Sequence, residues 1–117
     1  MTIIDEACLD TFRWQTQCEL CKARTNGCHP HHWRCRGRGS AWQLDVPICL
    51  LAICYVCHAK CHNGSIRRDD VLAVIAKREG LRPEVIRQAI NDLLRMPKGS
   101  DYKAYLETVY RTGENPT

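Results

Sequence analysis

Two Cys-x2-Cys pairs, Cys18 with Cys21 and Cys54 with Cys57, constrain this chain more than any other feature of its sequence. This spacing lets both sulfurs of a tight turn reach one tetrahedral ion, so the four thiolates together predict a structural zinc site. The 32 residues between the two pairs are then a structure that the metal holds at both ends. The alternative is that the four thiols are free and buried.

The chain contains nine cysteines, whose chemistry depends on the cellular compartment of the protein. The N-terminus is acidic where a signal peptide is basic, and no apolar run is long enough for a membrane-spanning helix. We therefore expect a cytoplasmic protein with no membrane partner, in which cysteines bind metal rather than form disulfides. The cysteines outside the two pairs are expected to be small buried residues. These five are Cys8, Cys28, Cys35, Cys49 and Cys61. Cys61 lies four residues after Cys57, so a different ligand set or a second zinc site is the alternative.

Positive charge gathers in the middle of the chain. The sequence of 117 residues has the length of one domain, and its 44% hydrophobic and 26% charged residues are typical of a folded chain. Residues 11–68 carry nine Lys and Arg against two acids, whereas residues 1–10 carry three acids and residues 69–117 carry eight of each. The same middle segment contains all five histidines. Metal ligands and positive charge therefore coincide and indicate nucleic acid as the partner, with a basic surface that has no partner as the alternative.

Local sequence signals predict an α+β chain whose strands come early and whose long helices come late. Turn residues separate short segments up to Gly64, after which apolar residues recur with helical spacing. Gly80, Pro83 and Pro97 are placed to end and begin the helices of this second part. The predicted elements are a short helix within residues 1–16, strands at 29–36 and 41–46, and helices at 55–61, 69–79, 83–96 and 101–111.

Four histidines lie where these elements can bring them together. His58 and His62 are one helical turn apart and share a face of the predicted helix at 55–61. His31 and His32 are neighbours on a predicted strand, so their side chains point to opposite faces. One of the two can join His58 and His62 on a metal while the other faces a substrate. A group of unrelated surface histidines is the alternative.

The segment from residue 17 to about residue 64 resembles an HNH endonuclease of the ββα-metal type. The resemblance is carried by the first Cys-x2-Cys pair, by the run HHWRCRGRG that starts at His31, and by the run CYVCHAKCHNG that starts at Cys54. Similar small proteins are common in phages and prophages. The resemblance implies an α+β fold, a small zinc-stabilised ββα-metal (HNH, or His-Me finger) domain, to which this chain adds a helical C-terminal extension that the resemblance does not cover.

The same resemblance implies a role for each of the four histidines. His31, His58 and His62 are the ligands of a catalytic divalent ion, which is Mg²⁺, Mn²⁺, Ni²⁺ or Zn²⁺. His32 is the general base that takes a proton from the attacking water. On this hypothesis the chain is a metal-dependent HNH endonuclease that hydrolyses DNA phosphodiester bonds by nicking or double-strand cleavage. The alternatives are a zinc-stabilised DNA-binding protein with an inactive HNH site, and a zinc protein-interaction module.

One position departs from the family pattern. The asparagine that is expected to brace the loop behind the histidine pair falls on Cys49 in this chain. A thiol is a weak donor and acceptor and cannot replace both functions of an amide. Either another residue braces the loop, with Asp45 and Gln43 as candidates, or the site is impaired.

Basic residues next to the histidine pair are the expected DNA contacts. Arg34, Arg36 and Arg38 alternate along the first predicted strand and can present guanidinium groups to phosphates, with Arg36 nearest to the site. Lys60 extends this surface, and a solvated hairpin face is the alternative. DNA is thus the predicted partner, while a homodimer and a phage or host protein partner stay open.

Four segments are expected along the chain. They are a helical lead-in at 1–16, the HNH domain with its four-cysteine zinc site at 17–66, a helical extension at 67–112, and a flexible tail at 113–117. The extension is expected to cap the zinc domain. The alternative is a helix-turn-helix within residues 71–94, with Gly80 in the turn.

Overall fold

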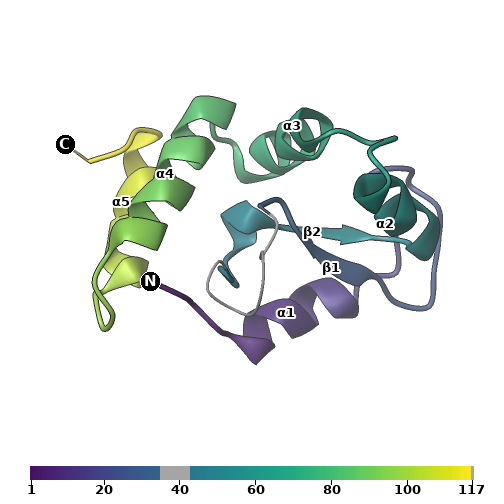
Figure 1. Cartoon of the computed structure of the whole chain (residues 1–117), viewed down its shortest axis with the longest axis horizontal. Helices are drawn as coiled ribbons and strands as arrows, with labels where there is room; N and C mark the ends of the chain where they lie inside the picture. The colour runs from purple at the N-terminus through teal and green to yellow at the C-terminus, as the bar shows by residue number, and fades with distance from the viewer. Residues whose placement is uncertain (35–42, 117) are drawn as a thin grey trace.

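The computed structural model describes residues 1–34 and 43–116, and this part of the chain forms a small α+β fold (Figure 1). It contains a sheet of two strands, five α-helices and one 3-10 helix. The elements in chain order are α1 (Glu6–Arg13), β1 (His29–His32), η1 (Pro47–Cys49), β2 (Leu50–Ile53), α2 (Tyr55–His62), α3 (Arg68–Glu79), α4 (Pro83–Arg95) and α5 (Tyr102–Thr112).

The helices confirm the sequence prediction to within one or two residues at most ends. Gly80 ends α3 because it adopts the left-handed conformation, with φ of 69°, and its N–H donates to the Ala76 carbonyl. Pro83 begins α4, where its missing N–H costs nothing. Asp101 begins α5, since its carboxylate accepts a hydrogen bond from the N–H of Ala104.

The strands differ from the prediction. β1 ends at His32, so the strand predicted at 29–36 is too long: residues 33–34 form a bend, and residues 35–36 lie outside the described part. The strand predicted at 41–46 is wrong over its described residues, 43–46, where Leu44 makes only an isolated parallel bridge to Ile3. The antiparallel partner of β1 is β2, whose four residues are all buried. Such a continuous apolar run has no alternation from which to recognise a strand.

The second edge of β2 is closed by side chains and loop backbone instead of a third strand. The N–H of Glu19 donates to the Ala52 carbonyl, and the Glu19 carboxylate accepts the N–H of Ala52 at 2.6 Å. Arg78 donates to the carbonyl oxygens of Pro47 and Leu50. Because unpaired buried backbone groups are costly, these contacts allow a two-stranded sheet to lie inside the protein.

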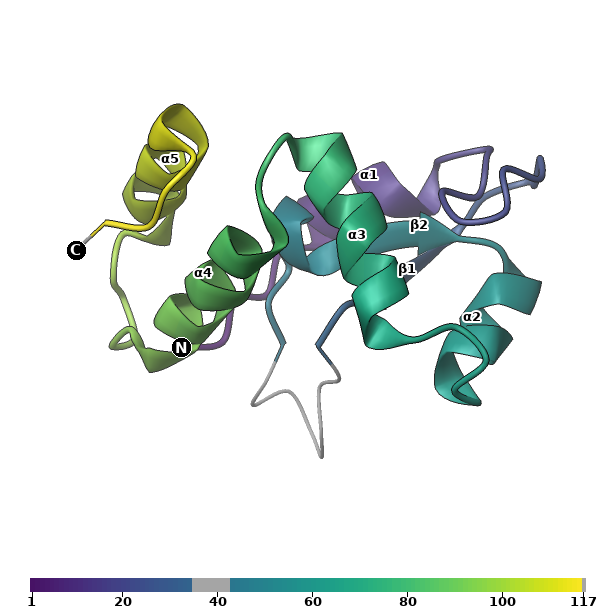
Figure 2. The same ribbon diagram turned by 90° about the horizontal axis from the view of Figure 1, so that it is seen from above.

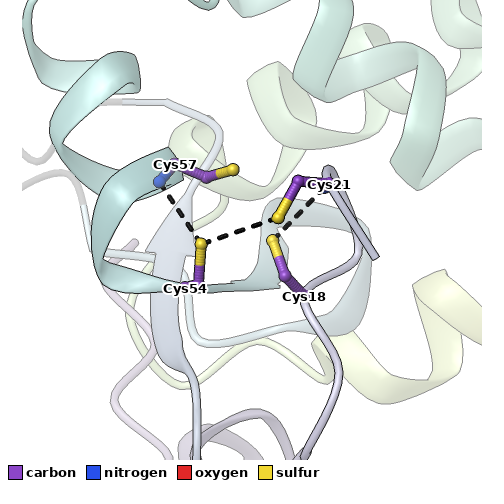
Figure 3. Close-up of side chains that lie close together, drawn as sticks. All are labelled: Cys18, Cys21, Cys54 and Cys57. Carbon is purple, nitrogen blue, oxygen red and sulfur yellow. Dashed lines mark hydrogen bonds between the residues drawn. The ribbon is translucent and has the colours of Figure 1, made fainter. Parts of the chain in front are cut away.

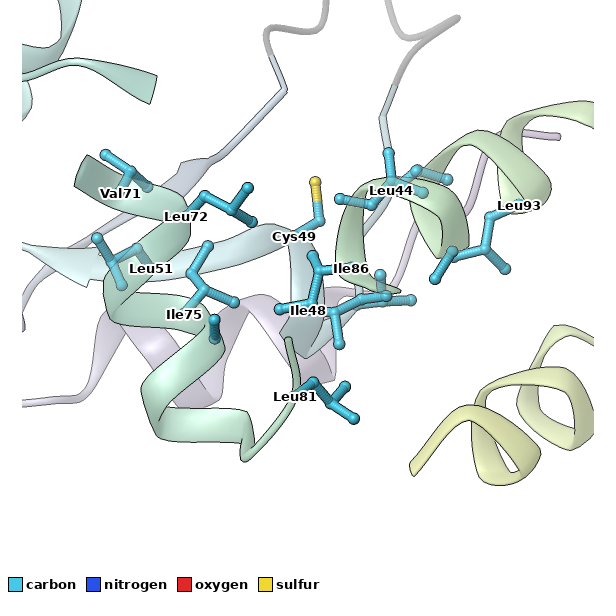
Figure 4. Close-up of a cluster of buried hydrophobic side chains, with 14 of the residues drawn as sticks. Leu44, Ile48, Cys49, Leu51, Val71, Leu72, Ile75, Leu81, Ile86 and Leu93 are labelled. Carbon is cyan, nitrogen blue, oxygen red and sulfur yellow. The ribbon is translucent and has the colours of Figure 1, made fainter. Parts of the chain in front are cut away.

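The sheet lies between α1 on one side and α3 on the other, with α2 at one end (Figures 1 and 2). α4 and α5 lie at the opposite end and contact each other. Side chains from η1, β2, α3 and α4 share one core, in which Ile48, Leu51, Ile75 and Ile86 have no exposed surface (Figure 4). The C-terminal helices therefore complete the core on which the sheet rests.

Candidate metal centres

Four cysteines converge from two separate parts of the chain (Figure 3). Cys18 and Cys21 belong to the turn after α1, whereas Cys54 is the N-cap of α2 and Cys57 lies in its first turn. All four sulfurs lie within 4.8 Å of one another. The predicted set of cysteines therefore forms one cluster that can bind a metal ion.

The local geometry of this cysteine cluster suits a tetrahedral zinc ion. The Cys21 and Cys54 sulfurs are 3.7 Å apart, close to the roughly 3.8 Å that separates two sulfurs on tetrahedral Zn²⁺ with Zn–S bonds of about 2.3 Å. In each pair the second cysteine donates its backbone N–H to the sulfur of the first, at 3.5 Å. These donors stabilise negative charge on the sulfurs, which a zinc ligand must carry.

The pKa of Cys18 shows the electrostatic effect of this arrangement. Burial raises the pKa of this thiol, but the backbone N–H groups of Cys21, Cys54 and Leu20 outweigh burial and lower it to about 6. The pKa of Cys57 is raised, because that thiol is buried and lies beside the other three sulfurs. A cation at the centre would relieve this repulsion between thiolates, so the donor set fits Zn²⁺.

The remaining described cysteines lie outside this cluster. Cys28 and Cys49 are buried, while Cys8 and Cys61 are partly exposed. Burial raises the pKa of Cys8 and of Cys49 to about 11, so both thiols are neutral at physiological pH. Cys35 lies outside the described residues.

A second group of ligands is formed by His31, His58 and His62. Their ring nitrogens lie within 4.8 Å of one another, and the Nε2 atoms of His58 and His62 are 3.0 Å apart. Two nitrogens on one tetrahedral zinc ion with bonds of about 2.05 Å are roughly 3.3 Å apart. β1 thus brings His31 against two histidines that one turn of α2 presents on a single face.

The electrostatics of this histidine cluster favour the neutral forms of His31 and His58. Burial, and then the nearby His58 and His62, lower the pKa of His31 to about 4. Burial and then the neighbouring His62 and His29 also lower the pKa of His58. A neutral imidazole is the form that binds a metal ion, so the three residues fit a divalent cation. As three protein ligands, they leave coordination positions for water or substrate.

His32 does not join the histidine cluster. It precedes the bend after β1, and its Nε2 lies 2.8 Å from Oδ1 of Asp45. The Asp45 side chain is completely buried, and it accepts further hydrogen bonds from the Gln43 side-chain amide and from the N–H of Asp5. His32 and His31 therefore have different partners, as their adjacent positions on a strand predicted.

Cys49 occupies a core position behind the histidine pair. Its backbone carbonyl accepts the N–H of Trp33 at 2.6 Å, which ties the residue after the pair to η1. Its thiol has no exposed surface and packs among apolar side chains (Figure 4). Asp45 contacts His32 directly, and the Gln43 side-chain amide donates a hydrogen bond to Asp45. The side-chain support of His32 thus comes from these two residues, while position 49 supports the backbone that follows the pair.

The predicted DNA-contacting residues have different surroundings. The Arg34 guanidinium donates to the Asn91 side chain on α4 at 2.9 Å. Lys60 is exposed on α2, next to the histidine cluster in the sequence. Arg36 and Arg38 lie outside the described residues, so the structure places neither.

Two residues beside the site were not singled out from the sequence. His29 lies two positions before His31 on β1, and its ring centroid is 5.2 Å from that of His58 and 6.2 Å from that of Tyr55. The same period of two that placed His31 could have indicated His29. Glu19, inside the first Cys-x2-Cys pair, closes the edge of β2, and nothing in its local sequence indicates that contact.

Comparison with protein-family models, curated proteins and solved structures finds no significant match. In the described part of the chain, no helix combines the length and the apolar character needed to cross a bilayer.

Proposed function

We propose that this chain is a metal-dependent endonuclease of the HNH type that hydrolyses DNA phosphodiester bonds. The observation that carries the proposal is the convergence of His31 from β1 with His58 and His62 from α2. The order of elements supports it, since β1 and β2 pair antiparallel and α2 follows β2 directly. The cysteine cluster at the start of α2 would hold this helix in place when zinc is bound.

The histidine cluster would hold the catalytic ion. A divalent ion bound there would supply positive charge to a phosphate oxygen and to the departing 3′ oxygen. The protein's part is to present three neutral nitrogens with a fixed geometry. Burial and the neighbouring rings, which lower the pKa of His31 to about 4, keep that ligand unprotonated at physiological pH.

In this proposal His32 accepts the proton of the attacking water. Its Nε2 faces a buried carboxylate, so we assign the imidazole proton to Nε2 and the free electron pair to Nδ1. Gln43 and the Asp5 N–H hold the Asp45 carboxylate in place. An oriented base of this kind typically contributes about 10²–10⁴-fold to the rate.

The position of His32 also favours a second candidate function. Its side chain is only 11% exposed, and one of its nitrogens is already engaged by Asp45. A histidine held in this way can serve the fold alone, in which case the chain is a zinc-stabilised DNA-binding protein that does not cleave. Such a protein binds DNA with an affinity that falls steeply with salt.

Cleavage of supercoiled plasmid tests the proposal. The zinc-loaded chain is incubated with added Mg²⁺, Mn²⁺ or Ni²⁺, and nicked and linear products are measured. We expect ion-dependent cleavage that His31→Ala abolishes and His32→Ala reduces at least about 10²-fold. His29→Ala is the matched control, because it removes an adjacent imidazole outside the ligand group.

Three results would contradict the proposal. Equal cleavage by His31→Ala and the unaltered chain would exclude the histidine cluster as the site. Full activity in His32→Ala would remove this residue as the base. Salt-dependent DNA binding without cleavage under any ion would establish the second candidate.

A further inference from the structure

A small pocket adjoins the histidine cluster. Its volume is about 110 Å³, and two of the three clustered histidines form one of its walls. The other walls come from the residue after β1, from the end of α2, and from the start of α3. The lining residues are His31, Trp33, Cys61, His62, Ile66, Arg68 and Val71.

The walls of this pocket combine apolar surface with one cation. Trp33 is fixed in place, because its indole N–H donates to the Arg68 carbonyl at 3.0 Å. Ile66 and Val71 supply further apolar surface. Arg68 is exposed, and no acidic side chain within residues 1–34 and 43–116 forms an ion pair with its guanidinium. The pocket therefore suits a planar group that is attached to an anion.

The size of the pocket limits what can enter it. Sites that enclose a whole small molecule usually have about 300–1,000 Å³. A volume of about 110 Å³ instead admits one ring-sized part of a larger substrate. That part must lie directly beside whatever the histidine cluster binds, since His31 and His62 belong to both sites.

We propose that this pocket receives the base of the nucleotide next to the scissile phosphate. Trp33 packs against the base, and Arg68 binds the phosphate on the far side of that nucleotide. The indole ring of Trp33 and the side chains of Ile66 and Val71 favour a base over a phosphate inside the pocket. The inference rests on the proposed function and adds a substrate preference to it.

The preference follows from how a duplex is built. A paired base is stacked between its neighbours, and it reaches a pocket only after leaving the helix at a cost of a few kcal/mol. An unpaired base does not meet this cost. The expected substrate is therefore DNA that is single-stranded at the cut, such as a free strand, a loop or a junction.

The experiment uses the full zinc-loaded chain and a fluorescein-labelled single-stranded 12-mer, with its duplex as the comparison. Binding is followed by anisotropy without added ion, and cleavage is followed with Mg²⁺ or Mn²⁺. Arg68→Gln removes the cation of the pocket. Its matched control is Arg67→Gln, because Arg67 is the exposed neighbour with the same charge and does not line the pocket. Ile66→Phe fills the pocket without changing charge.

We expect the single strand to bind and to be cut at least about fivefold better than the duplex. Arg68→Gln and Ile66→Phe should each weaken single-strand binding about fivefold or more, whereas Arg67→Gln should change it by about twofold or less. Trp33→Ala should cost about 5- to 150-fold, as removal of one aromatic stacking partner does. Since Trp33 also packs on the core, circular dichroism must first show that this variant is folded.

The results separate this inference from the proposed function. If the single strand is preferred and Arg68→Gln removes the preference, the pocket is a base site, even if no ion supports cleavage and the proposed function fails. If duplex and single strand are cut equally, and Arg68→Gln, Ile66→Phe and Arg67→Gln behave alike, the inference is overturned while the endonuclease stands.

Discussion

Arg78 on α3 and Glu19 in the first Cys-x2-Cys turn form a bidentate ion pair, with Nη1 of the arginine 2.9 Å from each carboxylate oxygen. The side chains are only 25% and 20% exposed. Together they also satisfy the outer edge of β2. A single ion pair therefore connects the cysteine cluster, the sheet and the helical extension.

We expect Arg78→Ala to lower the free energy of unfolding by about 3–5 kcal/mol. The substitution removes the cation beside the Glu19 carboxylate, which keeps the Ala52 N–H, and it removes the donor to the Pro47 and Leu50 carbonyls in a partly buried place. Denaturant unfolding of the zinc-loaded protein measures this loss. Arg87→Ala is the control, since its pair with Asp69 is exposed and should cost less than about 1 kcal/mol. Equal losses in both variants would mean that the Arg78–Glu19 ion pair stabilises the fold no more than an exposed pair does.

Removal of zinc should unfold the first half of the chain. Four thiolates that repel one another at this separation need a cation. Because the site exists only in the folded chain, the free energy of zinc binding contributes to the free energy of folding. Elemental analysis should find at least one zinc per chain, and a strong chelator should weaken the circular dichroism signal of the fold. Cys57→Ser should lose the zinc, while Cys8→Ala should keep it, because Cys8 lies outside the cluster. Retention of zinc by Cys57→Ser would refute the assignment.

The histidine cluster should bind a second ion that does not depend on thiolates. Cobalt(II) titration followed by visible absorption distinguishes the two sites, since only a cysteine site gives thiolate charge-transfer bands. We expect two equivalents for the unaltered chain and for His29→Ala, but one for His58→Ala, which leaves only His31 and His62. Two equivalents in His58→Ala would place the second ion elsewhere.

Placing an asparagine at position 49, where the HNH pattern has one, should harm the protein rather than improve it. Cys49 has no exposed surface, and Asp45 with Gln43 already supports His32. An amide is larger than the thiol in this closely packed place, and only its oxygen faces donors, the backbone N–H groups of Arg34 and Trp33. We therefore expect Cys49→Asn to cost about 2–4 kcal/mol of stability. Cys49→Ala, which only leaves a small cavity, should cost about 1–2 kcal/mol. A gain in cleavage by Cys49→Asn would contradict this prediction and would show that the thiol impairs the proposed site.

Stability should decline in alkali partly through the same thiol. Burial raises the pKa of Cys49 from 9.0 to about 11, although the backbone amides of Arg34 and Trp33 oppose this. Between these values the unfolded chain has lost a proton that the folded chain keeps. The contribution of the thiol is thus complete below pH 9 and is lost as the pH rises. The free energy of unfolding, measured across this range, should fall more steeply for the unaltered protein than for Cys49→Ala, and parallel curves would contradict the prediction.

Local sequence was enough to predict the parts of this protein that depend on short spacing. Cys-x2-Cys turns and histidines one helical turn apart place their side chains through local geometry. Glycine and proline likewise mark helix ends through their own backbone preferences. Cys54, Cys57, His58 and His62, together with the boundaries of α3 and α4, were for this reason predictable from sequence.

Tertiary structure alone decided the pairing of distant segments. β1 pairs with β2, whereas the described residues 43–46 form no strand. β2 was missed from the sequence because all four of its residues are buried and carry no alternating pattern. The partners of His32, Glu19 and Trp33 are 13, 59 and 35 residues away, counted to Asp45, Arg78 and Arg68. Such contacts depend on how buried polar groups find donors in the folded chain, which no local spacing encodes.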